Sequence, residues 1–195
     1  MHRQPIFRKN AVIAIVIASI AAAPACRRAP EETATPPPEA GPEAPAIATL
    51  ELPQHNPRIG ISLDVAPAGL VATYNGEYWI ELTDETRPTL RYDFVAKVPE
   101  TPGMLPADVA DFEALIHRYS DGTILGSGSV KTALGTADWS SGSFSEDGEV
   151  IETVTMFAPH PSGSGTVTLS SACPAGVATV EERLDVMKQL LAGIS

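Results

Sequence analysis

Apolar and polar positions alternate along much of the chain between Leu50 and Lys97. Apolar side chains recur at every second residue from Ile61 to Val65 and again from Leu90 to Ala96. This period places one side chain in two on a buried face and predicts half-covered β-strands. Two further runs, LVATY and EYWIEL, flank Asn75-Gly76, a dipeptide that suits the positive φ angles of a type I′ turn. The pattern therefore predicts a tight hairpin at this dipeptide.

Helical spacing replaces the alternation after Pro106. Apolar residues follow it at three- and four-residue intervals, acidic residues lie near the start, and Asp121-Gly122 ends the segment. A second helix begins at the capping box Thr179–Glu182 and carries one apolar face, formed by Leu184, Met187, Leu190, Leu191 and Ile194. Between the helices the pattern predicts a turn at 146–148 and strands at 123–125, 129–134, 136–144, 149–158 and 166–172.

The order of these elements indicates an α+β fold. The strands are too numerous and too closely connected for a parallel βαβ pattern. We therefore predict a twisted antiparallel sheet with an internal helix and a C-terminal helix packed on it. The element order over residues 50–195, with Trp139 among the strands and the closing pattern VTLSSACPAG…LDVMKQLLAGI, resembles the PsbP-like group of small exported domains. That resemblance implies an accessory or binding protein and assigns no site residue.

The N-terminus has the basic, apolar and small-residue order of a secretory signal. Arg3, Arg8 and Lys9 precede an uncharged run over 11–23, which is short for an uncleaved membrane anchor because a spanning helix needs about 20 apolar residues. The closing Ala23-Pro24-Ala25-Cys26 resembles a bacterial lipoprotein signal. The resemblance implies that residues 1–25 are removed and that lipid on Cys26 holds the protein to a membrane of the cell envelope. The same residues satisfy the Ala-x-Ala rule of ordinary cleavage, so a secreted soluble protein is the alternative.

The segment 26–48 reads as a tether, and 49–195 as a single domain. The tether contains six prolines and no aromatic residue, so it predicts an extended spacer that spans about 60 to 70 Å at about 3.1 Å per residue. Removal of the signal takes the formal net charge from −11 to −14, because its three basic residues are lost. This balance argues against nucleic acid as a partner and favours a basic ligand. The tether favours an envelope protein as the partner.

Signatures of catalysis are lacking in the sequence. The histidines beyond the signal, His55, His117 and His160, have no metal-ligand spacing, and there is no GxSxG motif. The acidic runs 84–85 and 146–149 lack the spacing of a calcium loop. We therefore predict no cofactor, no metal and a non-catalytic binding or accessory domain. The alternative is an exported hydrolase whose serine, histidine and acidic residues come from distant positions.

Cys173 and the aromatic residues are the remaining candidates for chemistry. With Cys26 acylated, Cys173 has no partner thiol, and a small buried side chain at a strand end is favoured over a reactive thiol near the last helix. Exposed aromatic residues would indicate a binding face, whereas most strand aromatics belong to the core. The residues in question are Tyr74, Tyr78, Trp79, Tyr92 and Trp139.

Overall fold

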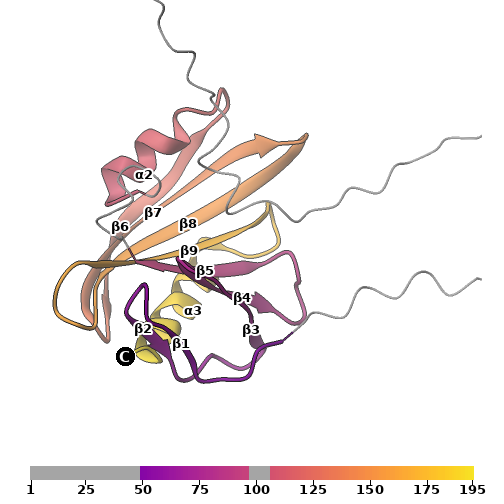
Figure 1. Cartoon of the computed structure of the whole chain (residues 1–195). Coiled ribbons are helices and arrows are strands. Elements are labelled where there is room, and N and C mark those ends of the chain that lie inside the picture. Colours follow the sequence, from indigo (N-terminus) through magenta and orange to yellow (C-terminus); the bar gives the residue numbers. More distant parts are fainter. Residues whose placement is uncertain (1–48, 97–105) are drawn as a thin grey trace, which may run out of the picture. The chain divides into compact units, whose positions relative to one another are not determined.

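The computed structural model describes residues 49–96 and 106–195, so the predictions for the signal, Cys26 and the tether lie outside the described residues. Two helices and nine strands make up the described part of the chain (Figure 1). In chain order they are β1 (Gln54–Asn56), β2 (Ile61–Leu63), β3 (Leu70–Asn75), β4 (Trp79–Asp84), β5 (Arg91–Ala96), α2 (Val109–Ile116), β6 (Thr123–Thr132), β7 (Gly135–Glu146), β8 (Glu149–Pro159), β9 (Thr166–Pro174) and α3 (Val180–Ala192).

A seven-stranded sheet dominates the fold. Its strand order is β3-β4-β5-β9-β8-β7-β6, and every neighbouring pair is antiparallel. β1 and β2 form a separate two-stranded hairpin, which the alternation of the sequence did not predict. An antiparallel sheet with two helices confirms the mixed α+β class.

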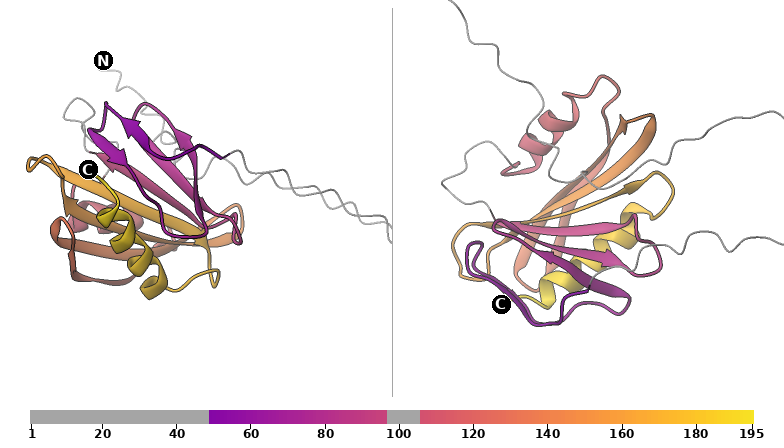
Figure 2. Two further views of the ribbon diagram at one scale, coloured as in Figure 1. Left: turned by 90° about the horizontal axis from the view of Figure 1, so that it is seen from below. Right: turned by 45° about the vertical axis from the view of Figure 1, so that its right-hand side comes forward.

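The main hydrophobic core lies between one face of the large sheet and α3, which Figure 2 shows against that face. Side chains two residues apart on a strand share a face, so Tyr92 and Phe94 of β5 point to the core together with Val154 and Met156 of β8. From α3 the cluster receives Leu184, Met187, Leu190 and Leu191. The predicted apolar face of the last helix is therefore confirmed.

α3 begins and ends in defined contacts. Thr179 and Glu182 form the predicted capping box, in which each side chain accepts a hydrogen bond from the other residue's backbone N–H. Beyond the helix the backbone of Ser195 exchanges two hydrogen bonds with Ser62 of β2, at 2.8 and 2.9 Å. The C-terminal residues thus anchor the small hairpin to the helix that closes the core.

α2 contacts the other face of the sheet, at its β6–β7 end. Asp108 caps the helix by accepting a hydrogen bond from the backbone N–H of Asp111, and Phe112 and Ile116 are buried. Gly142 of β7 lies under Ile116, because a Cβ at this glycine would come within 2.9 Å of Ile116 Cγ1. The predicted internal helix therefore contacts two strands at one end of the sheet.

The prediction of a type I′ turn at Asn75-Gly76 is wrong. β3 and β4 do form a hairpin, but three residues separate them, and neither Asn75 nor Gly76 has a positive φ. The ring of Tyr74 lies directly over this glycine and would have to shift to make room for a Cβ there. The two-residue turn with positive φ is at Asp147-Gly148, within the predicted turn at 146–148.

Two strand boundaries also differ from the pattern. β6 is one strand with an irregularity between Ile124 and Gly126, where two separate strands were predicted. Its glycines accommodate an aromatic ring, since a Cβ at Gly128 would lie 3.3 Å from Trp139 Nε1. The alternation predicted that Val65 is buried like Ile61 and Leu63, but β2 ends at Leu63 and Val65 is 65% exposed. Leu63 forms a bridge with Ile194 near the C-terminus, and the chain then leaves the hairpin.

Candidate functional site

One row of cross-strand partners runs through the whole sheet and is polar throughout. Directly opposed residues of antiparallel strands share a face. Asp93 alternates with the core residues Tyr92 and Phe94, so this row lies on the face turned away from α3. From β3 to β6 the partners are Tyr74, Glu81, Asp93, Ser170, Thr155, Ser140 and Ser127.

Hydrogen bonds join side chains at two places in this row, between β8 and β9 and between β7 and α2. The hydroxyls of Thr155 and Ser170 lie 3.0 Å apart. The hydroxyl of Ser140 donates to the carboxylate of Glu113 on α2 over 3.2 Å. Side chains from four elements thus meet along the row and satisfy one another there.

The β4 and β5 part of the row carries charge. Glu81 accepts a hydrogen bond of 2.9 Å from the Thr73 hydroxyl and forms an ion pair with Arg91, with a separation of 3.9 Å. The side chain of Glu81 is 23% exposed, so it lies at the border between protein and solvent. Its carboxylate is therefore partnered, and it forms the rim of the charged region.

Asp93 differs from its neighbour because it is buried and lacks a partner. Only 6% of the residue is exposed, and no hydrogen bond reaches its carboxyl group from the residues that the structure describes. Burial raises the pKa of Asp93 to about 7, the charge of Glu81 adds to the rise, and Arg91 opposes it. A carboxyl group in this state exchanges a proton near neutral pH and has unused capacity to form hydrogen bonds.

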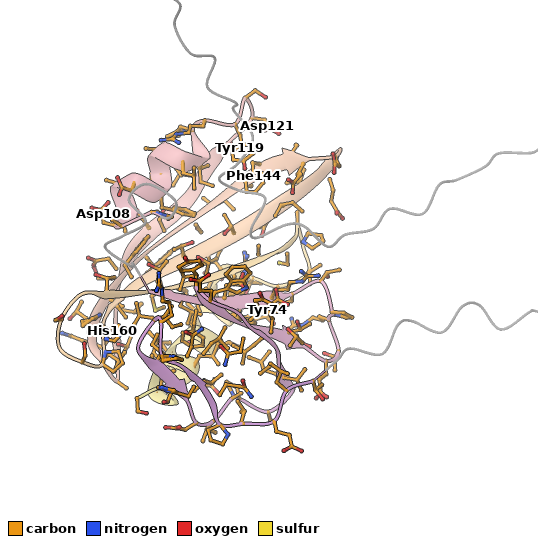
Figure 3. All side chains as sticks on the ribbon, viewed as in Figure 1. Tyr74, Asp108, Tyr119, Asp121, Phe144 and His160 are labelled. Atoms are coloured by element: carbon orange, nitrogen blue, oxygen red, sulfur yellow. The ribbon has the colours of Figure 1, made fainter. Side chains whose placement is uncertain are left out.

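An aromatic pair lies beside these carboxyl groups. A bulge between Ala72 and Tyr74 sets both Thr73 and Tyr74 opposite Glu81, and bulges of this kind re-aim side chains next to functional sites. The ring of Tyr74 packs on Trp79 with centroids 5.1 Å apart and an interplanar angle of 32°. Tyr74 is 45% exposed, and Figure 3 labels it on the β3–β4 side of the molecule.

We call Tyr74, Trp79, Glu81, Arg91 and Asp93 the acid–aromatic face. They come from three adjacent strands, and their registers place them together on one side of the sheet. The sequence pattern had pointed to exposed aromatic residues as a sign of binding, and Tyr74 has that exposure. Tyr92, also considered there, is a fully buried core residue. Asp93 was missed, because strand alternation assigns such a position to solvent.

The histidines are dispersed over the described structure. The ring Nδ1 of His55 lies 2.8 Å from the Ser62 hydroxyl on the exposed β1–β2 hairpin, and His117 is the exposed C-cap of α2. His160 accepts a hydrogen bond at Nδ1 from the backbone N–H of Ser162, so its Nε2 carries the proton and donates to the Ile59 carbonyl over 2.9 Å. His160 therefore fastens the loop before β2 to the end of β8, and its ring nitrogens are occupied by structural bonds.

Cys173 is buried at the end of β9, as the sequence indicated. Burial is the main cause that raises the pKa of its thiol, so the thiolate form is disfavoured at neutral pH. Behind it in the core lies Arg183 of α3, which is fully buried and donates to the backbone carbonyl and the carboxylate of Glu152, at 3.0 and 3.3 Å. No pattern in the sequence predicts this buried charge.

The acidic runs have local roles. Asp84 accepts hydrogen bonds from the backbone N–H groups of Thr86 and Arg87 and pairs with the Arg87 guanidinium at 2.9 Å. The run at 146–149 forms the turn between β7 and β8. Among residues 49–96 and 106–195, no three His, Cys, Asp or Glu side chains are grouped as metal ligands. No helix in these ranges is long and apolar enough to cross a membrane.

Comparison with models of known protein families gives no match, and neither does comparison with curated proteins. Among solved structures, the chain is similar to LpqN of Mycobacterium tuberculosis, involved in cell envelope biogenesis, with 14% identity and a TM-score of 0.46 over 69% of this chain and 82% of that one. The Ran-binding protein Mog1p of Saccharomyces cerevisiae has 13% identity and a TM-score of 0.43, with coverage of 77% and 96%. A chain of the Tle4–Tli4 complex has 12% identity and a TM-score of 0.39, with coverage of 74% and 53%. TM-scores below 0.5 leave the function to be argued from this chain's own residues.

Proposed function

We propose that the chain is an exported cell-envelope lipoprotein with a non-catalytic binding domain. Residues 1–25 direct export and are removed, Cys26 carries the lipid, and 26–48 tether a domain of the PsbP-like group that starts at residue 49. The export part rests on the order of basic residues, an uncharged apolar run and small residues immediately before a cysteine. The tether sets the domain at a distance from the membrane surface, on its periplasmic side.

The binding part rests on Asp93. A buried carboxyl group that receives no hydrogen bond destabilises the folded state at neutral pH, because its charged form has lost most of its water and the charge of Arg91 offsets only part of that loss. Groups of this kind concentrate at functional sites, where a ligand supplies the missing partner. Glu81 lies between Asp93 and Tyr74 in the register, so the buried carboxyl group and an exposed aromatic side chain share one face, and aromatic residues are enriched at binding surfaces.

The positions of the reactive side chains support binding over catalysis. A hydrolase of the serine type needs a histidine that contacts a serine and an acidic residue at once. His55 contacts Ser62 on the exposed hairpin, while both ring nitrogens of His160 bond to its own loop and to Ile59. Cys173 is buried with a raised pKa, which disfavours a nucleophilic role.

Mass spectrometry of the mature N-terminal peptide tests the proposal. The protein is expressed at full length in a bacterial host, the membrane fraction is collected, and the N-terminal peptide is compared between wild type and Cys26→Ser. We expect the wild-type peptide to begin at Cys26 with added acyl mass, and the variant to lack that mass. A soluble exported protein with unmodified Cys26 would establish the secreted alternative, and intact Met1 on cytosolic protein would refute export.

A further inference from the structure

The acid–aromatic face offers an aromatic surface next to hydrogen-bonding groups. Tyr74 is half-exposed and its ring packs on Trp79 in a tilted arrangement, so one amphipathic aromatic surface borders solvent. Glu81 and Arg91 are partly exposed, and the buried Asp93 is the direct cross-strand partner of Glu81. Ligand sites commonly combine apolar and aromatic side chains with a few polar groups that fix the ligand's orientation.

The charges of this face cancel in part, because Arg91 pairs with Glu81 at 3.9 Å and Asp93 holds its proton up to about pH 7. Arg58, between β1 and β2, pairs with Glu77 at 3.8 Å and lies over the Tyr78 ring in the β3–β4 turn. A cationic ligand would meet two guanidinium groups, and an anionic ligand would meet carboxylates. The paired charges therefore favour a ligand that is neutral and rich in hydrogen-bonding groups.

Asp93 supplies the independent sign of a ligand. Its carboxyl group is more than nine-tenths buried and has no hydrogen-bond partner among the described residues, although Ser170 and Glu81 flank it in the register. A ligand hydroxyl donates to a carboxylate and accepts from a protonated carboxyl group, so it satisfies Asp93 in either state. A ligand that carries only donors can bond only the carboxylate form of Asp93, and a ligand that carries only acceptors can bond only the protonated form.

From these observations we propose that the acid–aromatic face binds a neutral saccharide, whose apolar C–H surface packs on Tyr74 and Trp79 and whose hydroxyls bond Asp93, Glu81 and Arg91. This inference rests on the proposed binding function and names its ligand class. An envelope component of this class is a glycan chain. The aromatic rings supply contact area, and the carboxyl groups select for hydroxyls, because a site built to bond a hydroxyl rejects analogues that lack it.

Isothermal titration calorimetry on the full-length protein tests the ligand class, in a detergent without a sugar headgroup. The neutral probes are cellotriose, maltotriose and chitotriose, while trilysine and inorganic phosphate represent the charged classes. Tyr74→Ala removes the ring and Tyr74→Phe keeps it. Asp93→Asn removes the ionisable group, and Glu85→Gln removes one exposed charge outside the face. Circular dichroism establishes that each variant is folded.

We expect at least one trisaccharide to bind, with affinity at least tenfold lower in Tyr74→Ala and at least fivefold lower in Asp93→Asn. Glu85→Gln is expected to stay within twofold of wild type, and Tyr74→Phe, which keeps the ring, is expected to bind more tightly than Tyr74→Ala. Failure of all three trisaccharides to bind, or equal binding by wild type and Tyr74→Ala, would overturn the saccharide assignment. If trilysine or phosphate binds to wild type and this binding is lost in Tyr74→Ala and Asp93→Asn, the saccharide assignment is also overturned. The proposal of a binding domain would then still stand. The acyl mass of the N-terminal peptide is a separate outcome, so failure of export and failure of this ligand class are distinguishable.

Discussion

Replacing Asp93 with Asn tests the energetic reasoning behind the candidate site. The pKa of this carboxyl group rises from 3.8 to about 7 on folding, so the folded protein holds the proton more tightly than the unfolded chain. The penalty that this group imposes on the folded state is therefore absent below the unfolded pKa, develops as the pH rises toward 7, and changes little above it. A rise of this size corresponds to a full penalty of about 4 kcal/mol. Of this penalty, about 3 kcal/mol develops between pH 5 and pH 8.

Urea unfolding followed by tryptophan fluorescence measures this effect at pH 5, 6, 7 and 8. Asn is nearly isosteric with Asp and cannot ionise, so the variant lacks the penalty. The difference in unfolding free energy between Asp93→Asn and wild type should grow with pH in favour of the variant. Glu85→Gln removes the same charge from an exposed position, and its difference from wild type should stay nearly constant. Parallel curves for Asp93→Asn and wild type would refute the burial argument.

Three further changes have defined outcomes. Arg183→Met removes one partner of the buried ion pair with Glu152 and should cost about 3 kcal/mol in urea unfolding, whereas Lys188→Met at an exposed pair should cost less than about 1 kcal/mol; equal costs would contradict the burial of Arg183. Gly76→Ala displaces the Tyr74 ring and should reduce the near-ultraviolet circular dichroism of the stacked aromatic pair, and an unchanged spectrum would count against that packing. In the Cys26→Ser background, Cys173 should react with a thiol reagent only in denaturing urea, so stoichiometric labelling of folded protein would disprove its burial.

Local chemistry explains which elements could be predicted from the sequence. The capping box at Thr179 and the apolar stripe that follows it are short-range patterns, and α3 has both. The turn at Asp147-Gly148 has the residues that positive φ angles require. Asn75-Gly76 suggested the same turn, but contacts with a distant segment decide its shape, since the Asn56 side chain donates to the Asn75 amide oxygen and to the Gly76 carbonyl. Local propensity was overridden there by tertiary contacts.

The candidate site depends on registers that local patterns do not encode. Period-two alternation correctly assigns Tyr92 and Phe94 to the core, and it assigns Asp93 to the opposite face. Whether that face is solvated depends on neighbours from β4 and β9 that are distant in the sequence. Arg183 was missed for a related reason, because its partner Glu152 lies 31 residues away on β8. Of the candidate features, only the exposure of an aromatic residue had a sequence signal.

The ionisation of Asp93 itself is the most direct test of the proposed binding face. Carbon-13 NMR of the aspartate carboxyl groups, with Asp93→Asn to assign the resonance, reports its titration midpoint in the folded protein. We predict a midpoint at about 7 in the absence of ligand. A midpoint close to the 3.8 of an ordinary aspartate would contradict the buried, unpartnered carboxyl group from which the binding site is argued.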